Sequence, residues 1–139
     1  MAYAILEDLL KMVPEDELAQ LTSEAGELPD PLVAAEAIAR ADAEIDSYLG
    51  VRYQVPLAPV PHRVKALSVD VALYHLYSRR GVAPEIRRRQ YEDAIAFLKL
   101  VAGGQALIEG VGGEPPASQK TEDITGATRL FSRDGLGDW

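Results

Sequence analysis

Apolar residues recur at helical spacing through most of the chain before Gly104. The clearest run covers residues 31–49, where the apolar positions follow one another at steps of three and four and so share one face of an α-helix. These positions are Ala34, Ile38, Ala41, Ile45 and Tyr48. Asp30 suits the N-cap, Pro31 suits the first turn, and Gly50 suits the C-terminal end. The pattern predicts a helix over residues 31–49.

Two further long helices are predicted after a proline-rich connector. Residues 51–61 hold three prolines, so we expect an extended connector whose apolar side chains pack on the helices. A helix over about 61–80, closed by Gly81, is apolar on nearly all sides, which is typical of a centrally packed helix. The last long helix is predicted over 84–102. Its expected buried stripe is Tyr91, Ile95, Leu98 and Val101.

The N-terminal part of the chain predicts one or two short helices. Residues 3–12 show a short amphipathic helical pattern, which Pro14 ends. Pro14 can also open a second short helix, because three acids follow in its first turn, where the helix dipole favours them. Leu18 and Leu21 give this second helix an apolar face.

Beyond Gly104 the pattern changes, because closely spaced glycines and prolines interrupt any regular element. The last stretch nevertheless carries large apolar residues, which a merely solubilising tail rarely needs. They are Ile124, Leu130, Phe131, Leu136 and Trp139. The predicted fold class is all-α: a small helical bundle over residues 1–104, with three longer helices and one or two short N-terminal ones. Residues 105–139 are predicted to be a flexible linker and a partner-binding tail.

Composition fits a single soluble domain. The chain has 139 residues, of which 47% are hydrophobic and 26% charged. It has no cysteine, which excludes a disulfide scaffold, a thiolate zinc site and a cysteine nucleophile. We find no signal-peptide pattern and no apolar run near the roughly 20 residues of a membrane span, so no membrane association is expected.

Charge is distributed unevenly within a formal net charge of -8. Residues 1–50 carry twelve acids against two bases, whereas residues 51–103 carry nine bases against four acids. One interpretation is that an acidic helix lies on a basic one within the chain. The other is that an acidic and a basic surface favour head-to-tail contact between identical copies. Free binding to a nucleic-acid backbone is disfavoured, since a net anion is repelled by it.

Arginines gather on both sides of the turn predicted near Gly81, and some of them crowd the first turns of the last helix, where the dipole disfavours cations. A partner carboxylate could offset that cost, and the acidic first half could supply it. The candidate subunit-contact residues are Asp42, Asp46, Arg79, Arg80, Arg87, Arg88 and Arg89. The alternative is a helical regulatory or nucleic-acid-binding protein that uses the Arg79–Arg89 basic patch, although no aromatic interleaving or DNA-reading motif accompanies it.

No catalytic or metal-binding constellation stands out. Of the two histidines, His75 is expected to be a hydrogen-bonded core residue and His62 a surface residue. Asp42 and Asp46 share a helical face while Glu44 points elsewhere, so these acids are expected to form a solvated acidic face. We therefore expect no enzymatic activity, no cofactor and no metal.

Several segments, taken in order, match one known pattern. The most specific is the helix end Ala-Glu-Ile-Asp-Ser-Tyr-Leu at 43–49, with its exit Arg-Tyr-x-Val-Pro-Leu at 52–57. Asp8-Leu9-Leu10 precedes it, and Asp70-Val71-Ala72 and a terminal Phe131-Ser132-Arg133 follow. Over essentially its whole length the chain resembles the Mu-like prophage family of small neck proteins, which are similar to the head-tail connector (adaptor, head-completion) proteins of long-tailed phages.

The resemblance implies a homo-oligomeric ring beneath the portal vertex, commonly of twelve copies, formed from a chain that can be monomeric when isolated. Such a ring extends the DNA channel without binding the DNA tightly and offers a platform to the next tail or neck protein. The implied location is the neck of the virion, and the host cytoplasm during assembly. The C-terminal segment of similar proteins docks on the portal protein. The matching residues here are Leu130, Phe131, Ser132 and Arg133, with Ile124, Leu136 and Trp139 as helpers.

Overall fold

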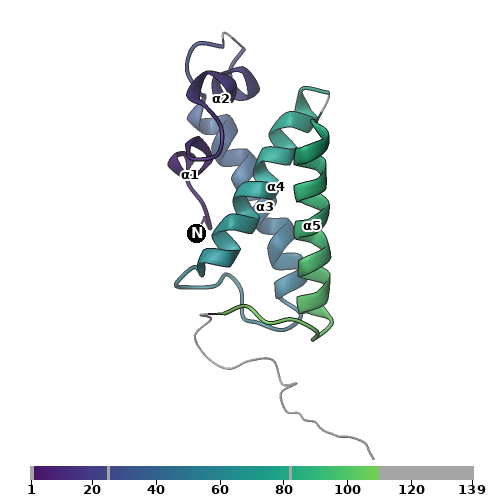
Figure 1. The fold of residues 1–139 in the computed structure, drawn as a ribbon. Coiled ribbons are helices and arrows are strands. Elements are labelled where there is room, and N and C mark those ends of the chain that lie inside the picture. The colour runs from purple at the N-terminus through teal and green to yellow at the C-terminus, as the bar shows by residue number, and fades with distance from the viewer. Residues whose placement is uncertain (1, 25, 82, 110–139) are drawn as a thin grey trace, which may run out of the picture.

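Three long helices form a bundle and two short ones cover one side of it in the computed structural model, which describes residues 2–24, 26–81 and 83–109 (Figure 1). The helices are α1 (Leu6–Leu10), α2 (Glu15–Thr22), α3 (Pro31–Leu49), α4 (His62–Arg79) and α5 (Glu85–Ala102). These residues contain no strand, so the predicted all-α class is confirmed. The long helices all pack on one another, whereas α1 and α2 pack on α3 and α4 but not on α5.

The ends of the long helices follow local signals in the sequence. The Asp30 carboxylate accepts a hydrogen bond from the Leu32 backbone N–H at 2.9 Å and caps α3, whose bounds match the prediction. Pro61 and Pro84 stand at the N-caps of α4 and α5. Gly81 has a φ of 102°, a left-handed conformation that favours glycine and lets the chain leave α4. The predicted helices over 61–80 and 84–102 are thus confirmed to within a residue or two.

The central position predicted for α4 is also confirmed. Its buried side chains point in several directions around the helix, which leaves only a narrow exposed strip. They are Val64, Leu67, Ser68, Val69, Val71, Ala72, Leu73, Leu76 and Tyr77. Leu57 of the extended connector is buried as well, and Tyr53, Val55 and Val60 pack partly against the same core. Burial of this apolar surface is the main stabilising contribution to the bundle.

The first predicted helix is shorter than residues 3–12, because α1 begins only at Leu6. Tyr3 lies outside the helix, in a bend beside α3. Its backbone N–H donates to the Asp42 carboxylate at 2.8 Å, and its hydroxyl donates to Asp46 at 2.5 Å. These long-range bonds hold Tyr3 outside the helix, and the Asp8 carboxylate then accepts the Ile5 N–H at 2.9 Å where α1 starts.

Tyr3 is the centre of a buried polar cluster that joins four parts of the chain. Its hydroxyl also accepts a hydrogen bond from the backbone N–H of Leu57 in the connector at 3.0 Å. Asp42 accepts a second bond, from Ser68 Oγ of α4 at 2.7 Å. The prediction of a solvated acidic face is therefore wrong for Asp42, which is only 7% exposed. The sequence pattern did not reveal this burial, because the hydrogen-bond partners of Asp42 lie far from it in sequence.

Burial also shifts the ionisation of this cluster. It raises the pKa of Asp42 above its ordinary value of 3.8, and the neighbouring charge of Asp46 adds to the rise. The hydrogen bonds from Tyr3 and Ser68 act in the opposite direction, since they favour the ionised form. Burial and the Asp46 carboxylate raise the pKa of the Tyr3 hydroxyl as well, so it stays protonated and donates.

The chain keeps packing on the bundle for a few residues beyond Gly104, the last residue of the predicted bundle domain. Ile108 is buried, and its N–H donates to the Tyr53 hydroxyl at 3.2 Å. Gly104 has a φ of 83° and lies so close to the Arg52 guanidinium that a Cβ there would be 2.6 Å from a guanidinium nitrogen. Residues 110–139, which hold most of the predicted linker and tail, lie outside the described residues, so that assignment stays a prediction.

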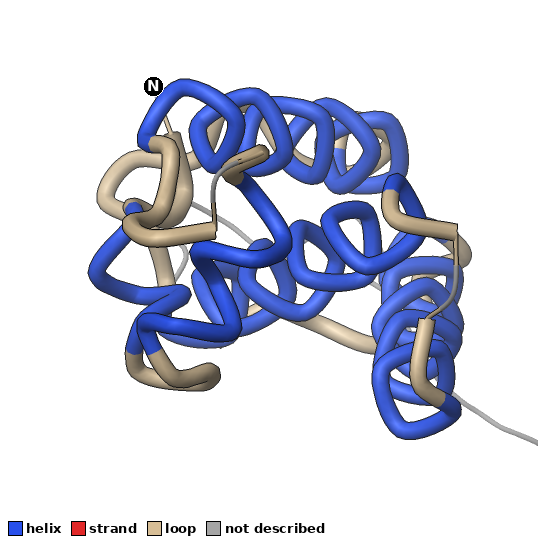
Figure 2. Tube along the Cα trace, turned by 90° about the horizontal axis from the view of Figure 1, so that it is seen from above, coloured by secondary structure: helices blue, strands red, loops and turns tan. Residues whose placement is uncertain are grey.

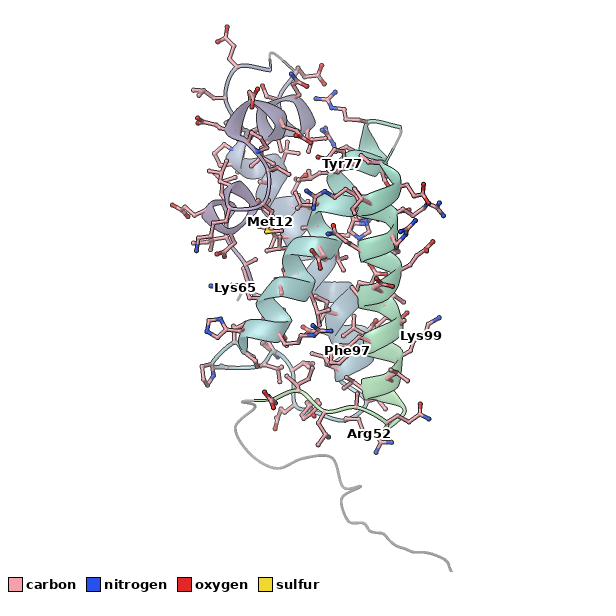
Figure 3. The ribbon with its side chains drawn as sticks, viewed as in Figure 1. Met12, Arg52, Lys65, Tyr77, Phe97 and Lys99 are labelled. Atoms are coloured by element: carbon pink, nitrogen blue, oxygen red, sulfur yellow. The ribbon has the colours of Figure 1, made fainter. Side chains whose placement is uncertain are left out.

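The two ends of the bundle differ in what they carry (Figure 1). The segment 103–109 lies at the lower end, near the end of α5 and the connector. The loop after α2 and the turn between α4 and α5 lie at the upper end. Arg52 is at the lower end, where its Nε donates to the Ala102 carbonyl at 3.1 Å (Figure 3).

Replacing Tyr3 with phenylalanine tests the central role of its hydroxyl. Tyr3→Phe leaves the buried Leu57 N–H without its acceptor, so we expect the free energy of unfolding in urea to fall by about 1–3 kcal/mol. Tyr48→Phe is the control, because the Tyr48 hydroxyl makes no hydrogen bond in the described part of the chain, and its expected change is within about 0.5 kcal/mol. Equal losses in the two variants would contradict this role.

The raised pKa of Asp42 predicts a pH dependence of stability. The folded state holds the Asp42 proton more tightly than the unfolded chain, so stability should rise as the pH falls from neutral through the raised pKa towards 3.8. The side chain introduced in the Asp42→Asn variant does not titrate. We therefore expect the unfolding free energy of the natural chain, relative to this variant, to increase on acidification in urea titrations at a series of pH values. A relative decrease would show that the fold stabilises the ionised carboxylate.

Candidate functional site

The described residues offer no metal site. In the ranges 2–24, 26–81 and 83–109, no three His, Cys, Asp or Glu side chains are placed to share an ion. No helix in the same residues is long and apolar enough to cross a membrane. The features that could recognise another molecule are the charged clusters and the exposed apolar faces.

Glu44 points away from Asp42 and Asp46, as predicted, and joins the three long helices. One of its carboxylate oxygens lies 3.1 Å from Nε2 of His75 on α4, and the other accepts from the Tyr91 hydroxyl of α5 at 2.6 Å. Tyr74 stacks on Tyr91 with ring centroids 4.2 Å apart. Burial and the Glu44 charge raise the pKa of Tyr91, so its hydroxyl remains a donor. The predicted hydrogen-bonded role of His75 is confirmed.

Two of the predicted subunit-contact arginines are bonded within the chain. Arg79 Nη1 donates to the Leu21 carbonyl at 2.9 Å, and Arg80 Nη2 donates to the Ser23 carbonyl at 3.0 Å. Both carbonyls lie at the end of α2, where backbone acceptors lack partners inside the helix. Part of the predicted basic patch therefore stabilises the packing of α2 on α4.

The arginines of α5 are paired mainly along their own helix. Arg88 lies 3.4 Å from Glu92, and Arg89 lies 2.7 Å from Glu85, each pair one helical turn apart and exposed. Such exposed pairs contribute little to stability. Arg87 donates to Gln90 at 3.0 Å, and its guanidinium carbon lies 5.9 Å from the ring centroid of Tyr77. Glutamates of α5 itself thus offset the unfavourable interaction of these arginines with the helix dipole. The sequence had suggested that other carboxylates would do so.

The structure brings Asp42 and Asp46 together but gives them different exposure. Asp42 is buried and both of its carboxylate oxygens are bonded to its own chain, which leaves little for an arginine of another copy. Asp46 is half-buried and keeps more of its carboxylate accessible. The subunit contacts remain a prediction. The predicted portal-binding residues lie outside the described part of the chain. They are Ile124, Leu130, Phe131, Ser132, Arg133, Leu136 and Trp139.

Sequence reasoning missed an open groove between the N-terminal segment and α3. Its volume is about 610 Å³, and we call it the alanine groove. Its lining comprises Ala2, Ala4, Ile5, Leu6, Pro31, Ala35, Ile38, Ala39, Asp42, Ala43 and Asp46. Ile5 is 55% exposed, and Leu32, on the same side of α3 as Ala35 and Ala39, is 75% exposed. The sequence signal for this groove was the alanine at every fourth position of α3, on a face other than the one that packs in the core.

A second exposed face, partly apolar and partly charged, lies on α5, on the far side of the bundle. Its positions follow steps of three and four and point away from the core residues Ala94, Leu98 and Val101. This outer face of α5 consists of Ile86, Arg89, Asp93, Ala96 and Leu100. Ile86 is 60% exposed and Leu100 is 45% exposed. In the view from above, the N-terminal end lies across α3 and α4 from α5 (Figure 2).

The described residues form a helical bundle with two distinct exposed faces, and comparison with known proteins finds relatives of this chain in Mu-like phages. The chain is similar to the Mu-like prophage FluMu protein gp36 of Haemophilus influenzae, with 39% identity over 104 residues, which are 73% of this chain and 72% of that protein. It is also similar to gene product J of Escherichia phage Mu, with 33% identity over 126 residues, 89% of this chain and 87% of that protein.

The family match covers nearly all of the described structure. The family model described as "Bacteriophage Mu, Gp36" matches residues 3–125. The match begins at Tyr3 and includes every helix, whereas Phe131-Ser132-Arg133, used above for the resemblance, lies beyond it. Together with the two relatives, this confirms the Mu-like phage resemblance seen in the sequence: the chain belongs to the bacteriophage Mu Gp36 family.

Proposed function

We propose that this chain is a structural neck protein that assembles as a ring beneath the portal, extends the DNA channel and joins head to tail. The observation that carries the proposal is the pair of dissimilar exposed faces, the alanine groove and the outer face of α5, on opposite sides of one bundle. A ring needs a heterologous contact between two different patches of the same subunit. Membership of a phage Mu family supports this role.

The polar clusters of the described residues support a scaffold rather than an enzyme. The Tyr3 cluster fixes the N-terminal segment on α3, and the Glu44 cluster joins the three long helices. In each cluster the hydrogen-bond donors and acceptors are bonded mainly to other members of the same cluster. A catalytic group instead needs a polar atom directed at a substrate.

The C-terminal segment is the proposed portal-binding element. The described part of the chain ends at residue 109, and a segment as long as residues 110–139, 30 residues, can span up to about 100 Å if extended. Leu130, Phe131 and Trp139 are the proposed anchors, since apolar side chains spaced along a segment suit strand addition or insertion into a groove of a partner. The ring would then form on the portal from chains that are monomeric beforehand.

The charge of the chain suits a passage for DNA rather than a DNA-binding surface. A net charge of -8 repels the phosphate backbone and would keep the duplex from being trapped in the channel. The alternative role in nucleic-acid binding would use the arginines near residues 79–89. The contacts of Arg79 and Arg80 with the end of α2 weigh against it, because these cations are already engaged.

Deleting residues 118–139 separates the scaffold from the proposed portal-binding element. The last described core residue is Ile108, so the far-UV circular dichroism and the urea midpoint should stay unchanged while binding to the portal of the same phage is lost. Phe131→Ala should weaken portal binding roughly tenfold or more, whereas the control Thr128→Ala should not. Retained binding by the deleted chain would refute docking through the tail, and loss of the fold would show that the tail belongs to the core.

A salt titration against duplex DNA tests the alternative function. We expect no binding of the isolated chain at near-physiological salt, because the net charge is negative and the arginines pair within the chain. Fluorescence anisotropy with a labelled duplex is the measurement. Binding near or below about 1 μM with a steep dependence on salt would favour a nucleic-acid-binding protein instead.

A further inference from the structure

We infer that the alanine groove of one copy receives the outer face of α5 of the next copy. This inference rests on the proposed ring and names the surfaces that would build it. It follows from three properties of the two faces, namely their shape, their charge and their placement.

The shape of the groove suits a helix. Ala35, Ala39 and Ala43 line one wall at steps of four, and small side chains let the backbone of another helix approach closely. The exposed Ile5 and Leu32 flank the groove with larger apolar surface. A volume of about 610 Å³ in a groove open along α3 leaves room for the side chains of such a helix.

The outer face of α5 has the matching pattern. Ile86 and Leu100 stand about four turns apart near its two ends, and both are exposed. Ala96 lies between them and gives the face a small position at which two helices can come near. Steps of three and four are the spacing of helices that pack side by side at a shallow angle.

The two helices have opposite net charges; on the outer face of α5, Arg89 suits the acidic groove, whereas Asp93 does not. Helix α3 carries four acids against one base, whereas α5 carries four bases against three acids. Asp46 lines the groove and is half-buried, and Arg89 lies on the outer face of α5, where the exposed Glu85 is its ion-pair partner among the described residues. Exposed ion pairs exchange partners at little cost, so Arg89 can turn to Asp46 of a neighbour.

The placement of the faces dictates the symmetry. The N-terminal segment and α5 lie on opposite sides of α3 and α4, and α1 makes no contact with α5. A groove on one side and a complementary face on the other give a head-to-tail contact, which closes into a ring if the rotation between copies permits. A two-fold dimer would instead require each face to meet itself.

The natural chain has no cysteine, so single cysteines report this contact directly. Ala39→Cys and Ala96→Cys copies are mixed on the portal and treated with a short bis-maleimide. We expect cross-linked dimers in the mixture and few with either variant alone. Ala66→Cys, at an exposed position of α4, replaces Ala96→Cys as the control and should cross-link poorly to Ala39→Cys.

The alternatives give different results in the same experiment. Cross-linking of Ala39→Cys alone would indicate a two-fold contact and overturn the inference. A higher yield between Ala39→Cys and Leu130→Cys than between Ala39→Cys and Ala96→Cys would overturn it in favour of the C-terminal segment as the occupant.

Filling the groove provides a second readout. Ala39→Trp should raise the protein concentration needed for assembly on the portal roughly tenfold, while Ala66→Trp should not, with circular dichroism confirming that both variants fold. The inference is overturned if a ring still assembles on the portal, the Ala39→Trp variant assembles as well as the natural chain, and the Ala39→Cys and Ala96→Cys copies do not cross-link. The proposed function would still stand in that case. If the natural chain forms no ring on the portal, both fail.

Discussion

A buried carboxylate must be given hydrogen-bond donors, and Asp42 receives them from Tyr3 and Ser68, which are far from it in sequence. Because Tyr3 also binds Asp46 and the connector at Leu57, one residue holds the N-terminal segment, α3 and the connector in a fixed relation. The alanine groove exists only because residues 2–6 are held along α3 in this way. The proposed assembly face thus depends on a polar cluster inside the protein.

The long helices were predictable because their boundaries are set by neighbouring residues. Asp30 and Pro31 define the start of α3, and Gly81 ends α4 through a backbone conformation that few other residues adopt. The start of α1 and the burial of Ile108 were not predictable, since Tyr3 pairs with α3 and Ile108 with Tyr53, more than 30 residues away. A periodic pattern carries no information about such distant partners.

The structure supports, in part, the interpretation that acidic and basic segments of one chain pack together, whereas head-to-tail contact between copies stays a prediction. Lys65 of α4 lies 3.7 Å from Asp8 of α1, and His75 meets Glu44, so acidic and basic segments do pack within the chain. Arg88 and Arg89 nevertheless remain exposed beside their glutamates on the side away from α1. Lys99 also points away from the bundle (Figure 3). The alanine spacing of α3 was a weak signal for the alanine groove, because alanine is common in helices on buried and exposed faces alike.

The described chain finishes with residues 103–109 at one end of the bundle, whereas the loop after α2 lies at the other. In an upright ring these two ends would become two chemically different rims. The rim with residue 109 would carry the segments directed at the capsid. The opposite rim would display Leu28, which is 68% exposed, between the acids Glu24, Glu27 and Asp30. A tail component that binds there would meet a circle of exposed Leu28 side chains surrounded by acidic residues. Its own docking surface should therefore be basic and contain apolar pockets.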